Sequence, residues 1–168
     1  ISHAHMDHSG LLPFLYKYDY NGPTYCTLPT KHLMTMLQLD YINLAEKDGR
    51  IPPYQRRDVK NTVLHTYPIG YGKVIDIAPD IKLTLHNSGH ILGSAMAHLH
   101  FGTGEHNLVY TGDYKFQKSR LLDVANSKFP RLETLITEST YGGSQDNIPS
   151  RIESEKRLIT VVNKTLEK

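Results

Sequence analysis

The six residues HAHMDH, at positions 3–8, decide how the whole sequence is interpreted. They place three imidazoles and one carboxylate in one short segment. Alternate side chains of an extended segment point the same way, so His3 and His5 can reach one metal ion. If the chain then turns into a helix, Asp7 and His8 face a second metal close by. Nitrogen and oxygen donors without thiolates favour zinc, with manganese and iron as alternatives.

A histidine-rich loop, or the remnant of an expression tag, is the alternative explanation of this segment. The alternating order of the histidines and the aspartate embedded among them are not typical of a tag. The chain has ten histidines, and imidazole is the commonest metal ligand in proteins. We therefore interpret residues 3–8 as part of a metal site.

Two other segments are candidates for the remaining ligands. His90 lies between Gly89 and Gly93 after a predicted strand, and these glycines permit a tight turn around it. Asp113 ends the run Tyr-Thr-Gly-Asp after another strand, where its carboxylate could bridge two metals. Alone, a histidine is more often structural and Gly-Asp is usually a turn. Together with residues 3–8 they predict a two-metal hydrolytic centre, with metals roughly 3.5–4 Å apart.

Composition limits the class of protein. The chain has 168 residues, of which 39% are hydrophobic and 21% charged, typical of a globular domain. No apolar run approaches the roughly 20 residues that span a bilayer, and the start resembles no signal peptide. One cysteine, Cys26, excludes an internal disulfide and a cysteine-based zinc site. We expect a cytoplasmic protein without membrane association, and a net charge of +2 does not by itself predict nucleic-acid binding.

The predicted secondary structure is of the α/β class, with helices packed on sheets. After a polar loop at 3–10, helices are expected at 11–18, at 30–46 capped by Thr30, and at 150–168. The apolar face of the second helix is expected to contain Leu33, Met36, Leu37, Ile42 and Leu44. Strands are expected at 24–27, 63–67, 73–76, 82–87, 95–101, 107–111 and 134–137. Within 95–101 the alternation predicts Ala95, Ala97, Leu99 and Phe101 on one face and Met96, His98 and His100 on the other.

These motifs carry a resemblance to a known family. The series His-x-His-x-Asp-His, followed by His90 and Asp113, resembles the metallo-β-lactamase superfamily. The segment Glu138-Ser139-Thr140-Tyr141-Gly142 is typical of its β-CASP branch of nucleic-acid nucleases. Residues 13–18, 37–41 and 89–95 are similar to the archaeal homologues of the nuclease subunit of the cleavage and polyadenylation specificity factor (CPSF).

The resemblance implies a ligand set and a reaction. The first zinc would be held by His3, His5 and His90, the second by Asp7 and His8, and Asp113 would bridge them. The implied reaction is hydrolysis of RNA, by endonuclease or 5′-exonuclease action, in 3′-end processing, transcription termination or decay. Asp7 would also orient the attacking water and act as a base. Glu138 would hydrogen-bond a histidine supplied from beyond an inserted domain.

The resemblance also implies that the chain is part of a larger enzyme. Residues 1–142 would form a partial αββα sandwich, truncated at both ends, and 143–168 a connection and first helix toward the β-CASP domain. The first metal site would have a full set of ligands and the second would lack one. We therefore expect the first site to be favoured and the chain alone to be inactive. Homodimerisation would use a region of the full-length protein outside these residues.

Two other functions are weighed against the ribonuclease. One is a small-molecule metallohydrolase of the same fold, and the other is a non-catalytic scaffold. The residues do not separate RNA from DNA as the substrate.

Three cations follow Asp113 and are candidates for contacts with RNA phosphates: Lys115, Lys118 and Arg120. A solvated charged loop is the plainer explanation of these residues. The six histidines outside the motifs are expected to be structural or surface residues.

Overall fold

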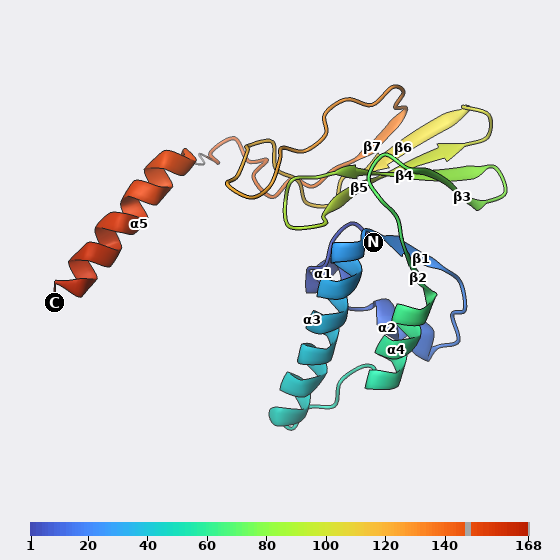
Figure 1. The fold of residues 1–168 in the computed structure, drawn as a ribbon, viewed down its shortest axis with the longest axis horizontal. Helices are drawn as coiled ribbons and strands as arrows, with labels where there is room; N and C mark the ends of the chain where they lie inside the picture. Colours follow the sequence, from blue (N-terminus) through green and yellow to red (C-terminus); the bar gives the residue numbers. More distant parts are fainter. Residues whose placement is uncertain (147–148, 168) are drawn as a thin grey trace. The chain divides into compact units, whose positions relative to one another are not determined.

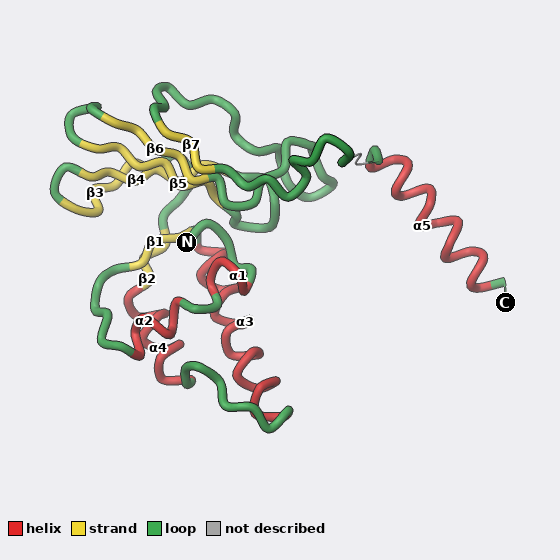
Figure 2. Tube along the Cα trace, turned by 180° about the vertical axis from the view of Figure 1, so that it is seen from behind, coloured by secondary structure: helices red, strands yellow, loops and turns green. Residues whose placement is uncertain are grey.

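The computed structural model describes residues 1–146 and 149–167, and the chain divides into two compact units, Ile1–Glu138 and Ser139–Lys168. In the first unit, Figures 1 and 2 show the helices gathered beside a pair of short strands, β1 (Thr24–Cys26) and β2 (Thr66–Pro68), with the larger sheet on the other side of that pair. This combination confirms the predicted α/β class. The helices of this unit are α1 (Met6–Ser9), α2 (Leu12–Lys17), α3 (Leu28–Lys47) and α4 (Arg56–His65).

The strands form a parallel pair and a mixed five-stranded sheet. The pair joins β1 (Thr24–Cys26) to β2 (Thr66–Pro68), and the sheet contains β3 (Val74–Ala78), β4 (Ile81–Asn87), β5 (Ala95–Phe101), β6 (His106–Tyr110) and β7 (Thr134–Ile136). The sheet follows chain order and is antiparallel up to β6, while β7 runs parallel to β6. The carboxyl ends of β6 and β7 therefore meet at one edge. The segments that contain Asp113 and Glu138 leave the sheet there.

The two faces of β5 bury different residues, as the alternation predicts. On one face Ala95 packs with Leu83 and Leu85, and Tyr25 and Ile69 from the neighbourhood of the β1–β2 pair lie against this cluster. On the other face Met96 packs with Val109 and Ala125, the last of which belongs to the long segment between β6 and β7. Around β5 the sheet is thus covered on both faces.

The predicted strand at 63–67 is wrong for its first three residues. The structure has α4 (Arg56–His65) in its place, and β2 begins only at Thr66. A capping box starts the helix: the Gln55 side chain bonds the backbone of Asp58, and Asp58 Oδ2 accepts from Gln55 N at 2.8 Å. Val59 and Thr62 supply its buried face. A period of two from residue 63 suggested a strand, but packing and capping of the helix outweigh that local pattern.

Helix α3 differs from the prediction at its start and in its buried face. Its N-cap is Thr27 rather than Thr30, and Thr27 Oγ1 accepts from Thr30 N at 3.3 Å. The buried face consists of Thr30, Met34, Gln38, Ile42 and Ala45. Met36 and Leu44, predicted to face the core, are exposed. Two polar residues belong to this face because each finds a partner: Thr30 Oγ1 donates to Gly93 O and Gln38 Nε2 to Ser9 O.

The second unit contains α5 (Arg151–Leu166), which confirms most of the predicted helix at 150–168. Ser150 and Glu167 are its caps, and Lys168 lies outside the described residues. Ser150 is its N-cap and forms a capping box with Glu153. Among its described side chains none is buried, and Ile152, Ile159 and Val162 are exposed. In the parts of the chain that the structure describes, no helix is both long and apolar enough to cross a membrane.

Candidate metal centre

The histidine motif is extended up to His5 and then forms one helical turn. Residues 3–10 are therefore not entirely the predicted loop, because α1 occupies Met6–Ser9. His8 N and Ser9 N both donate to His5 O, at 3.0 and 2.9 Å. Ser9 Oγ also donates to Ala4 O at 2.9 Å, which fixes the turn from inside. This local structure places His3 and His5 on extended backbone and Asp7 and His8 on the helical turn that follows.

The loop that contains His90 is held in a tight conformation. Gly89 and Gly93 have φ of +68° and +81°, as the sequence predicted for residues that permit a tight turn. Ser94 Oγ accepts from His90 N and from Ile91 N, both at 3.1 Å. Thr27 Oγ1 donates to Gly93 O at 2.6 Å, so the start of α3 also fixes this loop.

Asp113 follows β6 on a turn that packs directly against the histidine motif. Gly112, which precedes it, has φ +53°, and a Cβ there would lie 2.7 Å from the Ser2 side chain. Lys115 N, two residues further on, donates to Ser88 O at 2.8 Å and ties this segment to the His90 loop. Three segments far apart in the sequence are thereby brought together.

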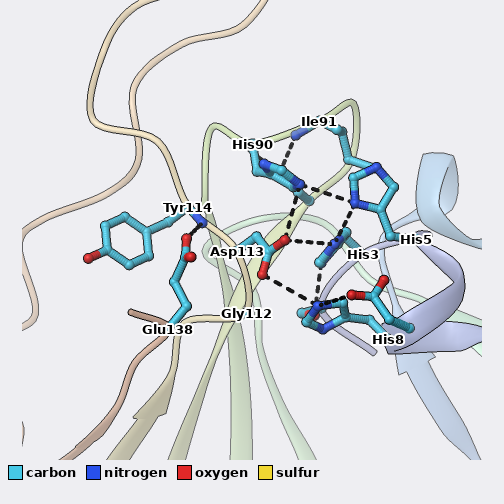
Figure 3. A network of polar contacts seen from close by, with 12 residues as sticks. His3, His5, His8, His90, Ile91, Gly112, Asp113, Tyr114 and Glu138 are labelled. Carbon is cyan, nitrogen blue, oxygen red and sulfur yellow. Dashed lines mark hydrogen bonds and ion pairs between the residues drawn. The ribbon is translucent and has the colours of Figure 1, made fainter. Parts of the chain in front are cut away.

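Four of the predicted ligands bring their donor atoms to one point, which we call the first donor set: His3 Nε2, His5 Nδ1, His90 Nε2 and Asp113 Oδ2. These atoms all lie within 4.8 Å of one another. His5 Nδ1 is 3.1 Å from His3 Nε2 and 3.2 Å from His90 Nε2. Asp113 Oδ2 is 3.7 Å from His3 Nε2 and 3.4 Å from His90 Nε2. Figure 3 shows the three rings turned toward the carboxylate.

These distances fit a tetrahedral metal ion. Two ligand atoms bound to one zinc at 2.0–2.1 Å in tetrahedral geometry lie about 3.3–3.4 Å apart. The four separations given above, 3.1 to 3.7 Å, scatter around that value. Three nitrogens and one carboxylate oxygen are also donors that zinc prefers. The residues therefore fit the metal that the motif predicts.

The other two predicted ligands lie on the opposite side of the Asp113 carboxylate. His8 Nε2 is 3.4 Å from Asp113 Oδ1 and 3.5 Å from Asp7 Oδ2. These three atoms form the second donor set. Asp113 thus turns one oxygen to each set, the arrangement expected of a bridging carboxylate (Figure 3). Within the described residues the second set has three donors and the first has four.

Burial keeps two histidines of the first donor set, His3 and His90, in the protonation state that binds metals. The His3 side chain is fully buried, and desolvation, followed by the charges that His8, His5 and His90 would carry, lowers its pKa to about 3. Desolvation also lowers the pKa of His90. Both imidazoles are therefore neutral at pH 7, with a nitrogen lone pair free for a metal.

Comparison with known proteins decides the family. A family model described as a metallo-beta-lactamase superfamily domain matches residues 1–140. The chain belongs to the metallo-β-lactamase superfamily. The resemblance inferred from the sequence motifs is thus confirmed, and the fold implies a metal at the His/Asp cluster.

Several archaeal proteins with the same name are similar to this metallo-β-lactamase chain. The transcription termination factor FttA of Lokiarchaeum sp. is 66% identical over 168 residues. Those of Methanothermobacter thermautotrophicus and Methanocaldococcus jannaschii are 58% and 56% identical over the same length. Each match covers 100% of this chain and 26% of the relative. The chain therefore spans about a quarter of the length of these relatives.

Glu138 lies at the edge of the metallo-β-lactamase site rather than among the ligands. Its Oε1 accepts from Tyr114 N at 3.0 Å (Figure 3), and its own N donates to Thr111 Oγ1 at 3.4 Å. Glu138 thus bonds the backbone of Tyr114 and the side chain of Thr111, which lie on either side of Asp113. The predicted hydrogen bond to a histidine from an inserted domain stays a prediction.

The three cations suggested for RNA contact lie on the surface after Asp113. Lys115, Lys118 and Arg120 are all exposed. Lys118 Nζ is 3.8 Å from Asp123 Oδ1, and both side chains of this pair are exposed. An exposed pair of this kind contributes little to stability, so Lys118 can exchange its partner for a phosphate.

The structure also identifies residues that the motif analysis missed. Ser2, Ser94 and Tyr110 each bring a hydroxyl to a candidate ligand or its loop. In the sequence, only their position beside the motif residues could have indicated that they belong to the site.

Of the six other histidines, His98 is fully buried against His86 and His100, and desolvation lowers its pKa to about 4. It is a structural residue, as expected.

Proposed function

We propose that this chain carries the metal centre of a zinc-dependent ribonuclease of the β-CASP type, acting in transcription termination or RNA 3′-end processing. The observation that carries the proposal is the division of the Asp113 carboxylate between two donor sets, with Oδ2 toward His90 and Oδ1 toward His8. Two-metal centres of this kind serve phosphodiester hydrolysis. The names of the archaeal relatives support a role in termination.

The proposed centre holds two zinc ions, one at each donor set. When bound, the metals would supply Lewis acidity and a water of lowered pKa. The first donor set has four protein donors and the second has three, so the first site binds more tightly in this chain. Manganese or iron at the second site is an outcome that metal analysis would detect.

The chain's own residues orient the reacting groups. Asp7 is 77% exposed, so its carboxylate is accessible from solvent beside the second donor set and can accept a proton from an attacking water. Asp113 is 28% exposed and presents the negative charge that holds both sites together. Lys115, Lys118 and Arg120 would neutralise RNA phosphates on the surface that follows Asp113.

The remaining assignments belong to the same proposal. We infer that residues 143–168 lead into the β-CASP domain, which the exposed apolar side chains of α5 support because they need a partner to be buried. RNA is the proposed ligand, the proposed compartment is the cytoplasm, and the full-length protein is proposed to be a homodimer. Light scattering of the full-length protein tests the last of these.

The function is tested by RNA cleavage with the full-length protein and labelled single-stranded RNA. Asp7→Asn removes the proposed base, and we expect the cleavage rate to fall by about 100-fold or more. Asp19→Asn is the matched control, since Asp19 is an exposed aspartate outside both donor sets, and its rate should be unchanged.

Two outcomes of this experiment would contradict the ribonuclease proposal. Hydrolysis of a β-lactam or thioester without RNA cleavage would indicate a small-molecule metallohydrolase. RNA binding without cleavage at any added zinc or manganese concentration would indicate a scaffold. Equal rates for Asp7→Asn and the unsubstituted protein would remove Asp7 from the mechanism.

A further inference from the structure

His3 has a polar partner on the side of its ring that faces away from the first donor set. Ser2 Oγ lies 3.2 Å from His3 Nδ1, while His3 Nε2 faces His5 and Asp113. The serine is only 6% exposed. Its carbonyl accepts from Ala95 N at 2.8 Å, and its side chain lies against Gly112. Ser2 is therefore held between the start of β5 and the turn that contains Asp113.

His8 also has a polar partner on the side of its ring that faces away from the metal-binding atoms, in this case a tyrosine. Tyr110 OH lies 3.4 Å from His8 Nδ1, and His8 Nε2 faces Asp7 and Asp113. Tyr110 is the last residue of β6, and its backbone pairs with Ala97 of β5. The sheet thus fixes the position from which this hydroxyl reaches the second donor set.

The two hydroxyls can determine which nitrogen of each imidazole carries the proton. A ring nitrogen that binds a metal must present its lone pair, so the ring proton lies on the other nitrogen. That N–H needs an acceptor, and the acceptor fixes both the tautomer and the rotation of the ring. For His3 the available acceptor is Ser2 Oγ, and for His8 it is Tyr110 OH.

We propose that Ser2 and Tyr110 are positioning residues, one for each metal site, which hold the ligating nitrogens of His3 and His8 toward the two donor sets. The inference rests on the proposed metal centre. It assigns separate control of the two sites to two hydroxyls that approach from different elements, a serine in the segment before the motif and a tyrosine at the end of a strand.

The test is stepwise zinc titration of the 168-residue chain by calorimetry, with each variant as the control for the other. Ser2→Ala is expected to weaken the tighter site by about 10-fold or more and to leave the weaker one within twofold of its original value. Tyr110→Phe, which keeps the ring, is expected to do the reverse. If Ser2→Ala does not fold, the half-exposed Tyr110 still decides the inference.

A spectroscopic measurement separates positioning from general loosening. In the zinc-loaded protein, the His3 Nδ1 proton is buried and bonded, so it should give a resolved downfield proton resonance that is absent in Ser2→Ala. Equal weakening of both sites in either variant, or unchanged affinity in both, overturns the inference. If the unsubstituted chain binds no zinc, the proposed function fails first and the inference with it; if it binds and the variants bind equally well, the inference alone fails.

Discussion

Replacing Asp113 with alanine is expected to weaken both metal sites at once. Its Oδ2 belongs to the first donor set and its Oδ1 to the second, so the substitution removes one ligand from each. A structural zinc site with four ligands gains about 10–16 kcal/mol on binding, or roughly 3 kcal/mol per ligand, so each affinity should fall by about 100-fold or more.

Two single substitutions provide the controls for Asp113→Ala. His90→Ala removes a ligand of the first donor set only, and His8→Ala one of the second only. Titration of all four proteins with zinc in competition with a chromophoric chelator measures the two affinities. A bridging role for Asp113 is contradicted if Asp113→Ala weakens one site and leaves the other unchanged.

The substitution Gly89→Ala is expected to destabilise the fold by about 2–5 kcal/mol. Gly89 has φ +68°, and a Cβ there would lie 2.7 to 2.8 Å from three backbone atoms, Lys115 O, Ala125 N and Asp123 O. Backbone atoms cannot rotate away as a side chain can. The steric overlap therefore adds about 1–3 kcal/mol to the roughly 1–2 kcal/mol cost of a left-handed alanine.

Gly72→Ala is the matched control for this substitution. Gly72 has nearly the same φ, +70°, but no atom lies within 4 Å of its Cβ position. Gly72→Ala should therefore lose only the roughly 1–2 kcal/mol that a left-handed alanine costs. Urea unfolding measures both free energies of unfolding. If both variants lose the same free energy of unfolding, the contact of the His90 loop with the segment after Asp113 does not contribute to stability.

The sequence was most informative where spacing and chemistry agree. HAHMDH, His90 and Asp113 predicted a cluster, and the structure brings these residues together from three segments. The alternation in 95–101 predicted both faces of β5, because a half-buried strand separates its side chains by geometry alone.

The errors have local physical causes. Helix α4 was missed because its capping box uses Gln55, and glutamine is not among the preferred capping residues. The buried face of α3 was misplaced because two polar residues, Thr30 and Gln38, are buried through hydrogen bonds. Their partners, Gly93 and Ser9, are distant in the sequence, so no local pattern indicates these bonds. Likewise, no pattern in the sequence specifies that Ser2 and Tyr110 lie behind the rings of His3 and His8, since this depends on tertiary packing.

The most direct test of the central claim is the metal content of the purified 168-residue chain, prepared without chelators and measured by elemental analysis. We predict close to one tightly held zinc per chain, because the first donor set has four protein donors, and loss of that zinc in His3→Ala. Retention of the zinc by His3→Ala, or a chain that holds no metal even after incubation with excess zinc, would contradict the assignment of this cluster as a metal centre.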